Sequence, residues 1–120
     1  MIEIMPETED KTLVVKATEM LTHQDYEEVF IPQLKQRIEK FGSIRVLFYL
    51  AENFTGWELG AAWDDAAFGI KHRHDFEKIA VVGGQKWVKW ATKIGSYLVD
   101  GQVATYESTE FQDAIAWLKQ

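Results

Sequence analysis

The chain has 120 residues, a formal net charge of −6, five tryptophans and no cysteine. This length predicts one domain over residues 1–120, large enough to bury its own core. The acidic balance argues against a nucleic-acid partner, and the lack of cysteine excludes disulfides, thiol nucleophiles and thiolate metal sites. The acidic N-terminus does not resemble a signal peptide, and the longest apolar run, Val46–Ala51, is too short to cross a bilayer. We therefore expect a cytoplasmic protein without a transmembrane segment.

Short runs rich in β-branched residues predict five strands. They are Ile2–Met5, Thr12–Thr18, Ile44–Leu50, Lys78–Val82 and Gln102–Tyr106. The first two runs are joined by Pro6–Lys11, which is typical of a hairpin loop. Helical segments separate and follow the later runs, so the element order is ββαβαβαβα. Strands separated by helices of this length pair in parallel through right-handed crossovers, so the chain is predicted to be an α/β protein with a mostly parallel five-stranded sheet.

The first helical segment carries signals at both of its ends. Thr22 and Asp25 have the spacing of a capping pair at its start, and Gly42 closes it where a left-handed residue is favoured. Pro32 lies inside the pattern and should kink this helix or divide off its first turns.

The second and last helices also have capping signals. Thr55 and Glu58 form a T-x-x-E capping box, which predicts a helix beginning at Thr55 and places Trp57 in its first turn. Ser108 or Thr109 can cap the last helix.

The strand patterns indicate how the helices cover the sheet. In the central run, Ile44, Val46, Phe48 and Leu50 share one face, while Arg45 interrupts the other. A sheet covered on both faces reads as nearly continuous apolar runs. The pattern therefore predicts helices mainly on one face and a partly wet second face.

Several segments resemble the SpoIIAA-like family, bacterial relatives of STAS domains that are sometimes grouped with CRAL-TRIO lipid-binding domains. They are Phe54-Thr55-Gly56-Trp57, Ala62-Trp63-Asp64-Asp65, the segment 72–76, Lys78 to Gly83, Lys86 to Trp90, and Phe111, Ala114 and Trp117-Leu118. The resemblance covers almost the whole chain. It implies a (βα) superhelix with most helices on one sheet face, and it implies no established activity.

Thr55 is the strongest single candidate for a regulatory phosphorylation site. In the anti-sigma factor antagonists, more distant relatives, a phosphorylatable Ser or Thr opens the corresponding helix. A phosphate on Thr55 would add about two negative charges at a helix N-terminus, where free N–H groups favour an anion. The Asp-Ser pattern of those antagonists is absent, because Phe54 precedes Thr55. A plain helix cap also explains this residue.

Catalytic groups are sparse. Asp64 and Asp65 are neighbours that point about 100° apart on a helix, so they do not form an acid–base pair. Asp65 and His72 share a helix face but are separated by about 10 Å of rise, too far to bind one metal ion. Solvent-exposed positions near a helix end are the better explanation of these residues. An enzyme that uses Asp64, Asp65 or His72 is therefore the third of our hypotheses. We expect no catalytic set, metal or cofactor.

A basic segment offers a candidate docking face. Residues 71–93 carry a net charge of +4, and the rest of the chain carries −10. Lys86, Lys89 and Lys93 fall at i, i+3 and i+7 beside Trp90, where they could meet an acidic partner, a lipid headgroup or a second copy of the chain. An ordinary solvated helix face explains the same pattern. The split charge and the aromatic content predict self-association as a homodimer.

The leading hypothesis places a binding site at the carboxyl edge of the sheet. Ligands of open α/β sheets bind beyond the carboxyl ends of the strands. The residues expected to bind there are Asn53, Phe54, Thr55, Trp57, Gly83, Gly84 and Trp87, and Tyr106 and Ser108 are expected at the same edge. This aromatic-rimmed cleft would suit a protein partner or a small apolar or anionic ligand. The chain is thus predicted to be a non-catalytic binding or regulatory module, with a Thr55 phosphorylation switch as the alternative.

Overall fold

The computed structural model describes residues 1–57, 74–84, 87–95 and 101–120. Its main sheet has five strands in the order β1-β2-β4-β6-β7. They are β1 (Ile2–Ile4), β2 (Thr12–Ala17), β4 (Ile44–Leu50), β6 (Phe76–Val82) and β7 (Gln102–Tyr106). The five predicted strands are confirmed to within two residues at each end.

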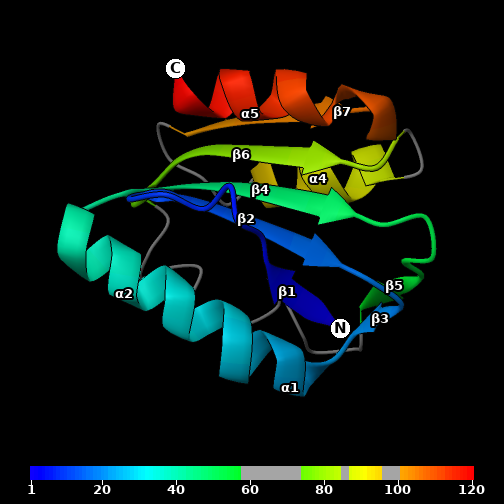
Figure 1. Cartoon of the computed structure of the whole chain (residues 1–120), viewed down its shortest axis with the longest axis horizontal. Coiled ribbons are helices and arrows are strands. Elements are labelled where there is room, and N and C mark those ends of the chain that lie inside the picture. The colour runs from blue at the N-terminus through cyan, green and yellow to red at the C-terminus, as the bar shows by residue number, and fades with distance from the viewer. Residues whose placement is uncertain (58–73, 85–86, 96–100) are drawn as a thin grey trace.

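The sheet is mixed. β1 pairs antiparallel to β2 across the predicted hairpin, whereas β2–β4, β4–β6 and β6–β7 pair in parallel. The description of the sheet as mostly parallel is corrected accordingly, because the short loop between β1 and β2 permits only an antiparallel partner. Figure 1 shows the arrowheads of β2, β4 and β6 at one end of the sheet, which is its carboxyl edge.

A second, two-stranded sheet was not predicted. β3 (Met20–Leu21) pairs in parallel with β5 (Gly56–Trp57) beside the carboxyl edge of the main sheet. Strands of two residues carry no periodic signal, so the sequence pattern could not reveal them. Their pairing corrects the prediction for Trp57, which lies on a strand and not in the first turn of a helix.

The first helical segment is divided as Pro32 predicted. α1 (His23–Asp25) and a π-helical turn, η1 (Tyr26–Phe30), precede α2 (Ile31–Phe41), which has Pro32 in its first turn. The Ile31 N–H donates to the Tyr26 carbonyl, five residues back. Proline cannot donate a helical hydrogen bond and crowds the carbonyl four residues earlier, so the turn before it widens.

Both predicted ends of this segment are confirmed. The Thr22 hydroxyl accepts from the Asp25 N–H at 3.0 Å, and the Asp25 carboxylate accepts from the Thr22 N–H at 3.1 Å. Gly42 ends α2 with a φ of +81°, and its N–H donates to the Ile38 carbonyl.

Helices cover both faces of the sheet. α2 and α4 (Val88–Gly95) pack on the first face, against side chains that include Val46, Phe48 and Ile79. α5 (Phe111–Lys119) packs on the second face, where Val14, Leu47 and Ala80 are fully buried. Figure 1 shows α2 and α5 on opposite sides of the strands. The prediction that helices lie mainly on one face is therefore confirmed only in part, because α5 covers the second face.

The start of α5 differs from the prediction. A 3-10 turn, η4 (Ser108–Glu110), precedes the helix, and the Glu107 N–H donates to the Glu110 carboxylate at 2.8 Å. Glu107 caps η4 and Glu110 holds the N-cap position of α5, so neither Ser108 nor Thr109 fills that role. Within the described part of the chain, no helix is long and apolar enough to cross a membrane.

Candidate functional site

A cleft of about 390 Å³ opens at the carboxyl edge of the sheet, and we call it the carboxyl-edge cleft. It is lined by Tyr49, Leu50, Ala51, Glu52, Gly83, Trp87 and Ser108. These residues come from the ends of β4 and β6, the start of α4 and the start of η4. The cleft is therefore assembled from segments far apart in the chain.

The paths of the chain beyond β6 and β7 explain why a cleft forms here. After β6 the chain enters α4 on the first face, and after β7 it enters α5 on the second face. The starts of the two helices therefore flank the sheet edge from opposite sides. Crevices of this kind, outside the carboxyl ends of strands, are the usual ligand sites of open α/β sheets.

Glycines close the turn after β6. The N–H groups of Gly83 and Gly84 both donate to the Tyr106 carbonyl, at 3.0 and 3.2 Å, which ties the ends of β6 and β7 together. A Cβ atom on Gly83 would lie 2.9 Å from Leu50 Cβ and 3.1 Å from Trp87 Cδ1. Gly84 has a φ of +90°, which favours glycine. The chain therefore turns tightly at Gly83 and Gly84, directly after β6.

The hydrogen bonds of this turn bear on the kind of ligand that could bind. Anion sites at βα turns use N–H groups that have no other acceptor. Here the N–H groups of Gly83 and Gly84 are taken by Tyr106, and the exposed carboxylate of Glu52 lies on the rim. The described part of the cleft thus offers an anion little attraction.

Phe54 belongs to the core. Its side chain is 2% exposed and its ring packs 4.8 Å from the Trp87 ring, centroid to centroid. It contacts Trp87 within the core and does not line the cleft. Asn53 and Thr55 are exposed, and they and Gly84 also lie outside the lining. The side chain of Trp57 lies outside the described residues.

Thr55 does not begin a helix. Its N–H and its hydroxyl both donate to the Glu19 carbonyl, at 2.8 and 3.3 Å, and the next residues, Gly56 and Trp57, form β5. The prediction that Thr55 caps a helix is therefore wrong, because the pairing of β5 with β3 draws this segment into a strand. Its predicted partner, Glu58, lies outside the described residues.

Most of the other predicted residues lie outside the described part of the chain. Asp64, Asp65, His72 and Lys86 lie outside the described residues, as do the side chains of Trp90 and Lys93. Lys89 is exposed on α4. The docking face thus stays a prediction. Over the described ranges, no group of three or more His, Asp or Glu side chains is placed to hold a metal ion.

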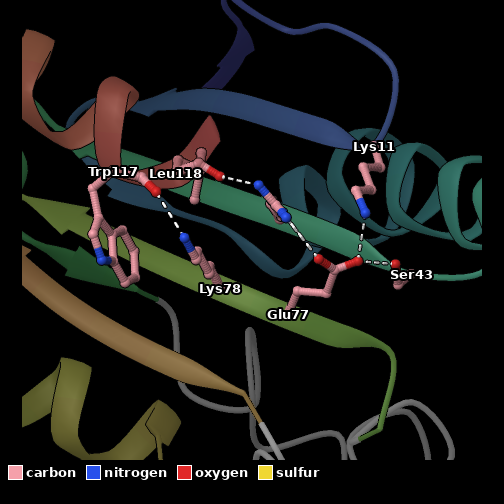
Figure 2. Close-up of polar contacts among 7 residues, drawn as sticks. Lys11, Ser43, Glu77, Lys78, Trp117 and Leu118 are labelled. Carbon is pink, nitrogen blue, oxygen red and sulfur yellow. Dashed lines mark hydrogen bonds and ion pairs between the residues drawn. The ribbon is translucent and has the colours of Figure 1, made fainter. Parts of the chain in front are cut away.

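A polar cluster at the opposite, amino edge of the sheet was missed by the sequence analysis. We call Lys11, Ser43, Arg45 and Glu77 the Glu77 cluster. The Glu77 carboxylate accepts from the Ser43 hydroxyl, from Lys11 Nζ at 2.8 Å and from Arg45 Nε at 3.0 Å (Figure 2). A β-bulge explains the position of Glu77, since Ile44 pairs with Phe76 and Arg45 with Lys78.

The same face anchors the end of α5. Arg45 Nη1 donates to the Leu118 carbonyl at 2.8 Å, and Lys78 Nζ donates to the Trp117 carbonyl at 2.9 Å (Figure 2). The Lys78 ammonium also lies 4.9 Å from the centre of the Trp117 ring. These two cations donate to carbonyls at the C-terminal end of α5, and they interact favourably with the negative end of the helix dipole. Because every group of the Glu77 cluster is paired, we interpret it as structural.

The pKa of Glu77 reports the strength of this pairing. Burial raises the pKa, but hydrogen bonds from Lys11, Ser43 and Arg45 and the Lys11 charge outweigh it and lower the pKa to about 2. The folded pKa thus lies below the unfolded value of 4.5. The ionised carboxylate therefore stabilises the fold above about pH 4.5, and this contribution is lost as the pH falls toward 2.

We expect this loss to amount to about 2 kcal/mol, after allowing for solvent screening of a partly exposed side chain. Urea unfolding at several pH values, on the wild type and on Glu77→Gln, measures it. The difference in the free energy of unfolding between the two proteins should have its full value at pH 6, and it should shrink steadily below pH 4.5. A difference that stays constant down to pH 2.5 would contradict the assignment.

The chain belongs to the SpoIIAA-like family, whose profile matches residues 12–119. Among solved structures, it is similar to an uncharacterized protein of the DUF3478 family with a SpoIIAA-like fold from Shewanella loihica PV-4. The two chains are 31% identical, with a TM-score of 0.68 over 98% of this chain and 92% of that one. No curated protein matches the chain. The resemblance drawn from the sequence is confirmed.

Proposed function

We propose that the protein is a non-catalytic binding module whose site is the carboxyl-edge cleft. The observation that carries the proposal is the cleft itself, which places Tyr49 and Trp87 around the ends of β4 and β6. A cleft of this size that combines polar groups with aromatic residues can hold a small molecule. Its occupant would be a small amphipathic molecule that contacts the rings and hydrogen-bonds at the rim.

The chemistry of the lining supports binding over catalysis. Among the described lining residues, Glu52 is the one carboxylate, and it stands with the hydroxyls of Tyr49 and Ser108. General acid–base catalysis needs a positioned proton donor or acceptor with a matched pKa, and nucleophilic catalysis needs a base beside the nucleophile. No histidine, lysine or aspartate accompanies them among the described lining residues, which favours a binding role.

The phosphorylation switch has weaker support. A phosphate on Thr55 would need donors around it, yet the Thr55 N–H is already bonded to the Glu19 carbonyl. The described strand β5 follows at once, so the favourable helix end that motivated the hypothesis does not lie at Thr55.

Filling the cleft should weaken ligand binding. Ser108 is exposed at the start of η4 and lines the cleft, so a phenylalanine there would occupy the ligand's space. In an NMR titration with a library of amphipathic fragments, the wild type should show shifts at Gly83, Trp87 and Ser108. Ser108→Phe should weaken binding by at least about tenfold, equivalent to about 1.4 kcal/mol.

Thr109→Phe is the matched control, because Thr109 is the next residue, is equally exposed and does not line the cleft. It should bind the fragments as the wild type does. Equal binding by all three proteins, or shifts confined to another surface, would refute the proposed site. Self-association stays a separate prediction, and light scattering that reports a monomer at high concentration would contradict it.

A further inference from the structure

We infer that the carboxyl-edge cleft selects organic cations, namely small molecules or side chains that carry an amine or quaternary ammonium group. This inference rests on the proposed function and adds the charge of the ligand to it. It is carried by two aromatic residues and a carboxylate that line one cleft, and by the hydrogen bonds that occupy the N–H groups of Gly83 and Gly84.

The aromatic rings are held in place by other rings. Trp87 packs against buried Phe54 at 4.8 Å, with 51° between the ring planes. Tyr49 meets Phe111 edge to face, with centroids 5.1 Å apart and planes at 82°. Tyr49 and Trp87 are each only partly buried and line the cleft. The faces of tryptophan and tyrosine rings attract cations, and fixed rings lose little entropy on binding.

Negative charge gathers around the same edge. Glu52 lies on the rim, and a Glu107 carboxylate oxygen lies 3.1 Å from where a Cβ on Gly84 would stand. Burial, followed by the charges of Asp113 and Glu110, raises the pKa of the Tyr106 hydroxyl. Carboxylates beside an aromatic cleft favour a cation and disfavour an anion.

The described lysines of this region do not line the cleft. Lys16 pairs in register with Tyr49 across β2 and β4, and Lys89 is exposed on α4. The N–H groups of Gly83 and Gly84, which could have received an anion, donate to the Tyr106 carbonyl. Within the described residues, the cleft therefore combines carboxylate and hydroxyl oxygens with two aromatic residues.

A pair of isosteric probes tests the inference directly. Choline and 3,3-dimethyl-1-butanol have nearly the same shape, but only choline carries a charge. NMR titration of the whole protein with each probe, at low salt, should give shifts at Gly83, Trp87 and Ser108. We expect choline to bind about tenfold more tightly than the alcohol, as cation–π and ion-pair contributions together predict.

Glu52→Gln removes the rim charge at an exposed position, and Glu39→Gln removes one from an exposed site on α2. Glu52→Gln should weaken choline binding about three- to fivefold and leave the affinity for the alcohol unchanged. Glu39→Gln should change the affinity for neither probe. Equal affinity for the two probes in the cleft would overturn the cation inference while upholding the binding site. Tighter binding of a third probe, acetate, would overturn it as well. If no probe and no fragment of the library shifts the cleft residues, both the inference and the proposed function fail.

Discussion

Replacing Phe54 with alanine is expected to lower the free energy of unfolding by about 3–5 kcal/mol. The side chain is 2% exposed and packs in the first-face core, where its ring supports Trp87. Its removal would leave a cavity between the end of β4 and the start of α4. The surrounding strands can close such a cavity only in part. Urea unfolding followed by far-UV circular dichroism measures the loss without relying on the fluorescence of Trp87.

The neighbouring residue provides the control. Asn53 is exposed, so Asn53→Ala should change the stability by no more than about 0.5 kcal/mol. The sequence predicts that Asn53 and Phe54 share a ligand site, whereas in the structure Asn53 lies on the surface and Phe54 in the core. If both substitutions were equally mild, Phe54 would not be the support that the structure describes.

The second large effect concerns the Glu77 cluster. Glu77→Gln should destabilise the fold by about 2 kcal/mol at neutral pH, because it leaves two partly buried cations without their carboxylate. Arg45 and Glu77 have side-chain exposures of 16% and 32%, so the pair is neither free in water nor fully desolvated. The expected loss accordingly lies between the values typical of surface and buried ion pairs.

A double-mutant cycle separates this pairing from unrelated effects. Arg45→Met alone should also be destabilising, since it frees both Glu77 and the Leu118 carbonyl. In the double variant the two losses should not add, because each single change already breaks the shared contact. Glu39→Gln, on exposed α2, should leave the stability within about 0.5 kcal/mol of the wild type. Strictly additive losses at Arg45 and Glu77 would contradict the described cluster.

The main strands and the first helix followed from local signals. β-branched runs located the five strands, and Thr22, Pro32 and Gly42 marked the start, division and end of the first helical segment. Each of these signals acts within a few residues, through side-chain size, a missing N–H or a left-handed backbone. Such effects can be evaluated before the fold is known.

The misses depended on contacts between distant segments. A T-x-x-E spacing predicted a cap at Thr55, but the pairing of β5 with β3 overrides it and bonds Thr55 to Glu19. The predicted strand began at Lys78, and only the register with β4 reveals the bulge that turns Glu77 toward Arg45. Neither register can be derived from one strand alone.

The candidate site was located by topology more than by residue type. The rule that ligands bind at the carboxyl ends of strands led to Gly83, Trp87 and Ser108, which line the cleft. It could not supply Tyr49 or Glu52, because their convergence with these residues depends on how far each strand extends and on which face the next helix takes. Whether these residues bind a ligand stays a prediction.

Intermolecular NOEs provide the most direct test of the carboxyl-edge cleft as the binding site. The measurement uses isotope-labelled protein saturated with the tightest-binding unlabelled fragment or choline, and it reports which side chains lie within contact of the ligand. The account predicts NOEs from the ligand to the Trp87 indole and the Tyr49 ring, and their loss in Ser108→Phe. NOEs that place the ligand at the amino edge, beside Arg45, or that survive in Ser108→Phe, would contradict it.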